Sequence, residues 1–495
     1  MKADFASSAL RRKLSLAAVA ALAALAAACT LGPDFKSPAP PATTSYASER
    51  GAELAPQDAA AFEQHTVQGK KLAPTWWKEF GSPELDGVID RAIAGNRSLA
   101  ATRARLDEAR EAVSAAEGVL YPQLDFAASA GGQRYSEAFL GQSEPGPAFA
   151  FLSLGPTVSY AFDVFGANKR RIEGTAALAD YQAYQLQAAV LTLSASVVGE
   201  VIAIASVRAQ MKAVEDILAD DRQNLELVRA ARAAGAVSDV DVLSAESQLA
   251  NDLTMLPALR QQLDIARHAL AILAGQAPAD WAPPDFELAR LTLPRELPLS
   301  LPSELVHARP DIMAAEAQLH AASATIGVAT ANLYPQLSLS ASLTQGALDP
   351  GHLFTPQGMA WSAIGGLTAP LFHGGELEAE RQAAIDAYRS ALASYEEVVL
   401  QAFGQVADAL SALAHDAEEI ASQKRAVEAA EASLRLTRLS YSAGNSGILQ
   451  VLDAERLLTQ ARLGYVRTEA RRYADTTQLF LALGGAALSP PPPTR

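Results

Sequence analysis

Cysteine is nearly absent from this chain, and acidic residues outnumber basic ones. A single cysteine stands among 495 residues, which excludes a disulfide framework. Lysine and arginine total 40 against 55 aspartates and glutamates, and the formal net charge is −15. This acidic balance argues against a nucleic-acid partner, because binding to the phosphate backbone requires clustered Lys and Arg.

Sequence motifs of catalysis and metal binding are also missing. The chain has no P-loop, no HExxH, no paired CxxC and no GxSxG motif, and its seven histidines lack ligand spacing. We therefore predict that the protein is not an enzyme and holds no cofactor or metal. Without a P-loop, it cannot drive transport by nucleotide hydrolysis.

The N-terminus carries an export signal. A basic stretch precedes the apolar run "LSLAAVAALAALAAAC", which ends at Cys29, and this order predicts a signal peptide over 1–28. The run resembles a bacterial lipobox, in which the cysteine becomes the lipidated first residue, although Ala26 stands where Leu is usual. A small buried cysteine in an ordinary signal peptide is the alternative. No other run resembles a transmembrane helix of about 20 apolar residues, so any membrane crossing would be made by strands.

The rest of the chain consists of two similar halves. The word "LYPQL" occurs at 120–124 and again at 333–337, and later landmarks recur at a near-constant offset of about 210 residues, which indicates a tandem duplication. The predicted parts are an extended segment at 29–80, a first repeat at 81–277, a Pro-rich connector at 278–302, a second repeat at 303–485 and a disordered tail at 486–495.

Each half changes from a helical pattern to a strand pattern. The runs 82–120 and 302–333 are predicted to be helical, and each ends at a "YPQL" word. Proline disfavours helix at the preceding residue and has no backbone N–H, so Pro122 and Pro335 predict a switch from helix to strand. The amphipathic rings of Tyr121 and Tyr334 suit a membrane–water boundary.

Two strands of about ten residues follow in each half. In "QLSLSASLT", apolar and polar residues alternate strictly, which predicts one apolar and one polar face. About 9–11 tilted residues cross a bilayer as a strand. Four strands cannot close a barrel, because the smallest natural membrane barrels have about eight, so a membrane-spanning form must oligomerise. A soluble hairpin with one solvated face is the alternative.

A long helix follows the second strand of each half. Proline is absent from 157–256 and from 371–489, and apolar residues recur at spacings of three and four, which predicts coiled-coil packing. In the first half, only Glu200 and Asp221 interrupt the apolar seam. A helix over 168–234 would be about 100 Å long.

Glycines mark the ends of these helices. Gly235 and Gly444 are predicted to supply left-handed C-caps. A returning helix then runs to about Gly275 in the first half and to about Gly485 in the second.

These features resemble the TolC-like outer-membrane factor family, and more narrowly its NodT-type efflux lipoproteins. The resemblance covers nearly the whole mature chain and rests on "CTLGPDFKSP", "PTWWKEFGSPELDGVIDRAIAGN", "LPSELVHARPDIMAAEAQL", "LDAERLL" and both "YPQL" words. It implies a mixed α and β membrane protein that forms a homotrimer. Four β-strands per chain would build a 12-stranded outer-membrane barrel, and long coiled-coil helices would build a periplasmic barrel.

The same resemblance implies a function. The chain would be the exit duct of a tripartite resistance-nodulation-division-type efflux system, passively conducting small molecules. Its partners would be itself, a periplasmic adaptor (membrane fusion) protein, an inner-membrane pump and outer-membrane lipid, with Cys29 as the lipid anchor in the Gram-negative outer membrane. Alternatives are a duct for type I protein secretion or metal-ion efflux, or a soluble periplasmic coiled-coil scaffold.

The resemblance also assigns candidate site residues. Leu449 and Asp453 fall on the periplasmic gate, where a ring of carboxylates repels anions and attracts cations. Asp241 and Tyr441 match a latch that ties neighbouring helices shut, although Ser446 replaces the Arg that reinforces it in some relatives. The tip turns, "RAARAAGAVSD" (229–239) and "RLSYSAGNSG" (438–447), would dock the adaptor. Candidate docking residues are Arg229, Arg232, Gly235, Ser238, Arg438, Gly444 and Ser446.

Overall fold

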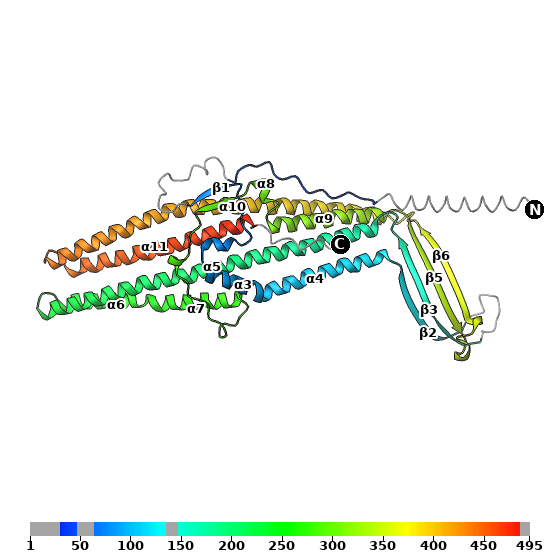
Figure 1. The fold of residues 1–495 in the computed structure, drawn as a ribbon, viewed down its shortest axis with the longest axis horizontal. Coiled ribbons are helices and arrows are strands. Elements are labelled where there is room, and N and C mark those ends of the chain that lie inside the picture. The colour runs from blue at the N-terminus through cyan, green and yellow to red at the C-terminus, as the bar shows by residue number, and fades with distance from the viewer. Residues whose placement is uncertain (1–29, 47–63, 135–146, 486–495) are drawn as a thin grey trace, which may run out of the picture. The chain divides into compact units, whose positions relative to one another are not determined.

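The computed structural model describes residues 30–46, 64–134 and 147–485 (Figure 1). The chain divides into two compact units. The predicted signal peptide, Cys29 and the tail at 486–495 lie outside the described residues. Unit 1 contains the N-terminal stretch up to Ser37, Asp107–Tyr181 and Ala315–Tyr395. Unit 2 contains Pro38–Leu106, Gln182–Ala314 and the chain from Glu396 onward.

Unit 1 is organised around a four-stranded antiparallel sheet. The strands lie side by side in the order β2-β3-β5-β6 (Figure 1). Their bounds are Gln123–Gln133, Phe149–Phe162, Gln336–Ala347 and Met359–Thr368. The predicted two strands per half are therefore present. β2 and β6 are the edge strands, and neither has a second partner strand in the described part of the chain.

The register of the sheet separates apolar from polar side chains. Paired residues in an antiparallel sheet lie on the same face. One face collects the pairs Leu124↔Val158, Tyr160↔Leu339 and Leu343↔Trp361. The other face collects Thr157↔Ser342 and Ser159↔Ser340, and the hydroxyls of Ser342 and Ser362 lie 2.9 Å apart. Ile364, which breaks the alternation of β6, pairs with Ser340 and so lies on the polar face.

Both "YPQL" words stand at a change from helix to strand. In the first half, α4 (Arg97–Glu117) and a short 3₁₀ turn (Gly118–Leu120) end just before Tyr121, and β2 begins two residues later. In the second half, α9 (Pro310–Ala331) ends just before Tyr334 and β5 begins at Gln336. The predicted switch therefore occurs in both halves.

Two long helices follow the hairpins. α5 (Ala167–Ala233) and α10 (Glu376–Ser442) each contain 67 residues, or about 100 Å at 1.5 Å per residue. The bounds of α5 differ by one residue at each end from the prediction. Contrary to the expectation that no run beyond the signal peptide resembles a transmembrane helix, α5 contains an 18-residue window that is apolar enough to cross a membrane by length and composition. Since 56% of that window is buried in the protein, its hydropathy reflects packing between helices.

The remaining predicted helices are less continuous than expected. The run 82–120 breaks at Asn96 into α3 (Pro83–Gly95) and α4. The Asn96 side chain accepts a hydrogen bond from Leu99 N (2.9 Å) and donates to Leu273 O (3.0 Å), so it caps α4. The run 302–333 breaks into α8 (Pro302–Leu305) and α9, because Pro310 cannot continue a helix from the preceding turn.

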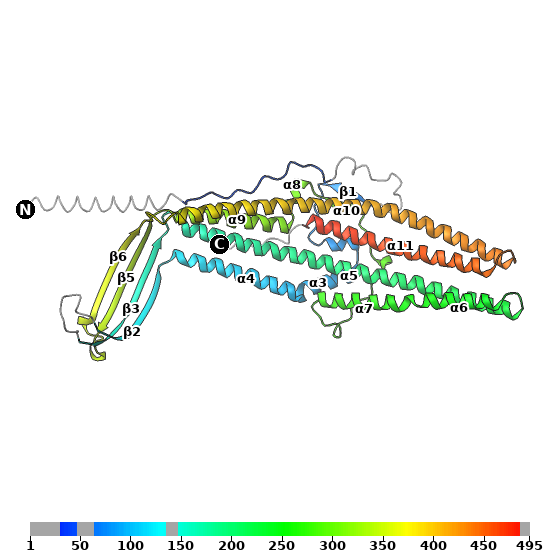
Figure 2. The ribbon, with the colours of Figure 1, turned by 180° about the vertical axis from the view of Figure 1, so that it is seen from behind.

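The returning helices differ between the two halves (Figure 2). In the first half, the return is split into α6 (Asp239–Leu253) and α7 (Met255–Leu273), just before Pro257. In the second half, α11 (Ile448–Leu483) is continuous and lies beside α10. The two repeats are therefore similar in plan but unequal in detail.

Unit 2 has an aromatic core that contains segments expected to be irregular. Trp76 and Phe80, from the 3₁₀ helix Trp76–Phe80, are each 1% exposed and pack edge-on against Phe480 of α11. Nearby, β1 (His65–Gln68) pairs in parallel with β4 (Glu296–Leu299). Two four-residue strands so far apart in sequence give no periodic signal, so neither strand was predicted from the sequence. Short 3₁₀ turns also occur at Leu288–Arg290, Pro350–His352 and Pro356–Gly358.

We predict that Gly275→Ala destabilises unit 2. Gly275 has φ +73°, and a Cβ added there would lie 2.1 Å from the carbonyl oxygen of Gly95. A left-handed residue with a Cβ and an overpacked contact together cost about 2–4 kcal/mol. Thermal unfolding of the detergent-solubilised protein, followed by helical circular dichroism, measures the change. Gly404→Ala is the control, since no atom lies within 4 Å of its added Cβ; equal melting temperatures in both variants would contradict the prediction.

Candidate functional site: the helical tip

Both tip turns use the same backbone motif. Gly235 and Gly444 have φ of +76° and +75°, which favours glycine. Ala236 N donates to Ala231 O (2.9 Å) and Asn445 N donates to Ser440 O (2.9 Å), and these bonds define a Schellman C-cap. The predicted caps are therefore present in both halves, at the ends of α5 and α10.

A single apolar cluster joins the four helices of the tip. Val228 of α5 is 0% exposed and packs with Ala245 of α6, Leu434 of α10 and Val451 of α11. Tyr441 is partly buried and packs against the same cluster. The cluster fixes the turns relative to each other, so side chains of α6 and α11 beyond it have defined positions.

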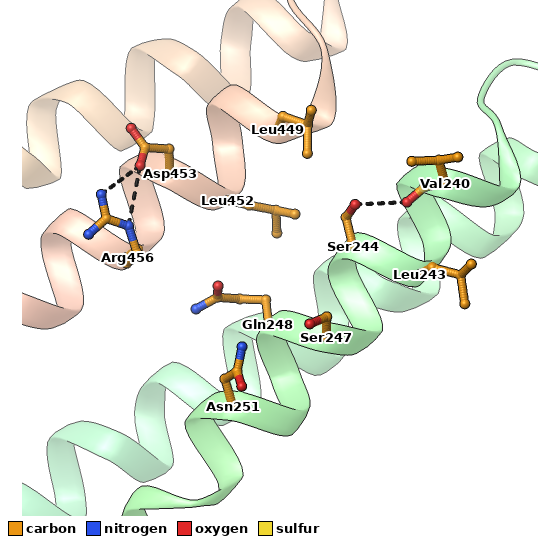
Figure 3. Close-up of a pocket in the computed structure, with 10 residues that line it drawn as sticks. All are labelled: Val240, Leu243, Ser244, Ser247, Gln248, Asn251, Leu449, Leu452, Asp453 and Arg456. Carbon is orange, nitrogen blue, oxygen red and sulfur yellow. Dashed lines mark hydrogen bonds and ion pairs between the residues drawn. The ribbon is translucent and has the colours of Figure 1, made fainter.

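An open groove of about 470 Å³ lies between α6 and α11 (Figure 3). The α6 side is polar apart from Val240 and Leu243, and the α11 side carries both candidate gate residues. Within α6, the Ser244 hydroxyl donates to Val240 O (2.8 Å). The lining residues are Val240, Leu243, Ser244, Ser247, Gln248, Asn251, Leu449, Leu452, Asp453 and Arg456.

The candidate gate residues lie one turn apart on the same side of α11. Leu449 is 57% exposed, and the side chain of Asp453 is 61% exposed. A third residue, Arg456, was not predicted from the sequence; its Nη2 donates to Asp453 Oδ1 (2.8 Å) (Figure 3). The i,i+3 spacing in "LDAERLL" was the available signal. The candidate gate therefore carries a carboxylate and a guanidinium together.

The two candidate latch residues are not bonded to each other within the described chain. Asp241 Oδ2 instead accepts hydrogen bonds from Ser238 N (2.8 Å) and Ser238 Oγ (2.7 Å). The bond from Ser238 N belongs to the capping box at the start of α6, and the two bonds together lower the pKa of Asp241. Both go to one carboxylate oxygen, and Tyr441 stands on a different helix, α10.

The candidate docking arginines are engaged in ion pairs. Arg232 binds Asp239 in a bidentate pair (2.7 and 2.9 Å) across the first turn, which lowers the pKa of Asp239. Arg229 contacts both Glu226 (2.9 Å) and Glu246 (2.8 Å). These pairs are exposed, so they orient the side chains at the surface more than they stabilise the fold.

Arg438 belongs to a different environment, a buried acidic cluster beneath the tip. Its Nη2 lies 2.8 Å from Glu455 Oε1, and the Glu455 side chain is 6% exposed. Asn224 of α5 also donates to Glu455 Oε1. Ser446, the last docking candidate, precedes α11 in the second turn and is partly buried.

The same cluster explains why Asp221 interrupts the apolar seam of α5. Asp221 and Asp252 are each 4% exposed, and Gln248 donates to Asp252 Oδ2 (2.9 Å). Burial, then the neighbouring Asp252 and Glu455 carboxylates, raise the pKa of Asp221 to about 7. The polar break in the sequence therefore marks a point where carboxyl groups of three helices meet.

We predict that Asp221 makes the protein less stable as pH rises. Its pKa is about 7 in the folded state and 3.8 in the reference state, so the folded protein binds the extra proton between these values. Stability therefore falls from about pH 4 to about pH 7, by an amount on the order of a few kcal/mol. Asp221→Asn should flatten the dependence of the melting temperature on pH between about 4 and 7.

The control for this measurement is Asp216→Asn, an exposed position on the same helix. It should keep the wild-type slope. Identical slopes in wild type and Asp221→Asn would show that Asp221 is not the titrating group.

The two candidate boundary tyrosines lie in unit 1. Tyr121 is 69% exposed, whereas Tyr334 is 40% exposed and packs against Phe165, with ring centroids 4.9 Å apart and the rings tilted by 32°. Pro122 and Pro335 each precede the first residue of a strand. In the described ranges, no group of three His, Cys, Asp or Glu side chains could hold a metal ion.

Comparison with known proteins gives consistent matches along the chain. A family model described as "Outer membrane efflux protein" matches residues 88–276 and 301–485. The chain is 30% identical to the pyoverdine export outer membrane protein OpmQ of Pseudomonas aeruginosa, over 83% of this chain and 87% of that protein. It is 28% identical to nodulation protein T of Rhizobium leguminosarum bv. trifolii, over 91% and 93%. The solved structure of the outer-membrane channel OprN superposes with a TM-score of 0.82 at 29% identity, covering 92% of this chain and 99% of that one.

Proposed function

Because the chain belongs to the outer membrane efflux protein family, we propose that it is the exit duct of a tripartite resistance-nodulation-division-type efflux system. The family consists of TolC-like channels, so the chain is an outer-membrane efflux channel of NodT type and not an enzyme. It would conduct small molecules passively from a periplasmic adaptor and an inner-membrane pump to the cell exterior.

The two open edges of the sheet carry this proposal. β2 and β6 each expose a row of backbone groups, and the sheet has one apolar and one hydroxyl-rich face. In a bilayer, such a sheet is stable only as part of a closed barrel. Because β2 and β6 run in opposite directions, β6 of one copy can pair antiparallel with β2 of the next. We infer a homotrimer with a 12-stranded barrel, whose apolar face meets lipid and whose polar face lines the lumen.

The helix-to-strand switches would mark the membrane boundary. Tyr121 and Tyr334 present exposed amphipathic rings just before the first residues of β2 and β5. Such rings favour the level of the lipid head groups. The long helices would then form the periplasmic barrel, and the tip turns would be the surface for the adaptor.

The gate would lie at the groove between α6 and α11. In a trimer, Leu449 would supply an apolar ring and Asp453 an acidic ring. The ion pair with Arg456 (2.8 Å) means that each carboxylate is accompanied by a cation. The pore would therefore discriminate ions less strongly than a ring of bare carboxylates.

We predict opposite effects of removing the two charges at the gate. Asp453→Asn leaves Arg456 unpaired, so the preference of the pore should shift toward anions. Arg456→Gln leaves the carboxylate unpaired and should shift it toward cations. Reversal potentials of the purified trimer in planar bilayers under a salt gradient measure both. If the two variants keep the wild-type reversal potential, the gate lies elsewhere; if wild-type protein gives no conductance, the channel proposal itself fails.

The latch would act between helices of neighbouring copies. Asp241 uses only Oδ2 for its capping box, so Oδ1 can accept from a tyrosine hydroxyl. Tyr441 is held by the apolar cluster at the tip, which would orient its hydroxyl.

We predict that Tyr441→Phe and Asp241→Ala both raise the single-channel conductance of the closed trimer. Each variant removes one partner of the proposed hydrogen bond, and Phe keeps the ring packing. Tyr465→Phe on α11, outside the tip turns, is the control. Conductance equal to wild type in both latch variants would exclude the latch, whatever the state of the gate.

The N-terminus would anchor the protein. We propose that residues 1–28 are removed on export and that Cys29 is acylated, because the cysteine directly follows the apolar run and its small residues. The mature protein would then consist of the extended segment at 29–80, the repeats at 81–277 and 303–485, the connector at 278–302 and the tail at 486–495.

A further inference from the structure

The segment that follows Cys29 in the sequence, Thr30–Ser37, lies against helices of unit 1. It forms neither helix nor strand. Leu31 N donates to the carbonyl of Phe165 (3.1 Å), in the short link between β3 and α5. The other partners of the segment come from the first two turns of α5 and from α9, so its contacts join residues more than 100 positions apart.

Arg170 of α5 makes most of these contacts. It is 4% exposed. Its Nε donates to Leu31 O (3.1 Å), and its Nη2 donates to Gly32 O (3.4 Å) and to Asp34 Oδ1 (2.7 Å). Its Nη1 donates to Glu173 Oε2 (2.7 Å). A buried guanidinium requires partners for its charge and its donors, and the N-terminal segment supplies most of them.

Glycines allow the backbone of the segment to touch the helices. Gly32 has φ +93°, and a Cβ added to it would lie 2.4 Å from Gly327 Cα of α9. A Cβ added to Gly327 would in turn lie 2.7 Å from Arg170 Cγ. At the start of α5, a Cβ on Gly166 would lie 2.4 Å from Thr30 Cγ2. The contact between the segment and the helices therefore leaves no room for a Cβ at these three glycines.

The far end of the segment is held by aromatic and polar contacts. Phe35 stacks on His320 of α9 with ring centroids 4.4 Å apart and an interplanar angle of 13°. His320 Nε2 lies 2.9 Å from Glu173 Oε1, so Glu173 joins Arg170 to His320. The Ser37 hydroxyl donates to Glu316 Oε1. The contacts thus extend over the whole segment.

We propose that Arg170, Glu173 and His320 form a clasp for the chain's own N-terminal segment, and that this clasp holds the acyl group of Cys29 beside the link between β3 and α5. The inference rests on the proposed lipidation of Cys29. One residue, Thr30, separates the held Leu31 from the acylated position, so the two Cα atoms are at most about 7 Å apart. The acyl chains would therefore enter the bilayer next to the end of β3, and the clasp would set the depth of the anchor relative to the sheet.

Spin labelling of the segment tests the clasp. Lys36 is exposed and lies between Phe35 and Ser37, and the acylated Cys29 has no free thiol, so Lys36→Cys gives one labelled site. In proteoliposomes, the label should be immobilised in the otherwise wild-type protein. Arg170→Gln should raise the mobile fraction severalfold. Arg171→Gln is the matched control, because Arg171 is exposed and donates to Asn168 rather than to the segment.

Asp34→Asn removes the carboxylate that the segment offers to Arg170, so it also weakens the clasp. If Arg170→Gln fails to assemble, Asp34→Asn serves as the test variant. The depth of the label in the bilayer is measured from its relaxation by oxygen and by a water-soluble nickel complex. The distribution of depths should be narrow in the otherwise wild-type protein and broad in Arg170→Gln and Asp34→Asn. A label that stays immobilised in both Arg170→Gln and Asp34→Asn overturns the clasp. Mass spectrometry of the N-terminal peptide tests lipidation separately, and conductance in planar bilayers tests the channel.

Discussion

The backbone groups along the outer edges of β2 and β6 have no partner strand in the described chain, and a bilayer supplies none. A water-soluble protein can leave such edges to solvent, but an outer-membrane channel must pair them. The requirement extends to the faces of the sheet, which must be apolar toward lipid and polar toward the lumen. The register meets it, since Leu343 stands opposite Trp361 and Thr157 opposite Ser342. One constraint thus links the strand pattern, the open edges and the need for other copies.

The duplication gives the chain two copies of the same plan. Each half supplies a hairpin and a 67-residue helix, and each helix ends in the same glycine-capped turn. The halves then diverge. The first returning helix is broken before Pro257, whereas α11 is continuous. The candidate gate residues Leu449 and Asp453 both lie on α11, the continuous returning helix of the second repeat.

Buried charges organise the chain at several points outside the apolar core. Arg309, in the signature "HARPDIMAAE", is 6% exposed and pairs in bidentate fashion with Asp311 (3.0 and 2.6 Å). Its Nη1 also donates to Ala482 O (2.6 Å) at the end of α11. Arg170 similarly joins the N-terminal segment to α5, and the acidic cluster around Asp221 joins three helices of the tip. Each buried group needs particular partners, so these points select one arrangement of helices.

The sequence by itself determined those features whose cause is local. Proline in "YPQL" ends a helix wherever it stands, strict alternation predicts a two-faced strand, and Gly235 and Gly444 are needed at a left-handed cap. The family resemblance and the candidate gate at Asp453 also rested on short contiguous sequence motifs. The tertiary structure alone decided what depends on residues far apart in the chain: the pairing of β1 with β4, the partners of Arg170, the meeting of Asp221 with Asp252 and Glu455, and the register that places Ile364 on the polar face. These features depend on which surfaces come into contact after folding. Contacts between residues far apart in the chain leave no periodic pattern in a single sequence.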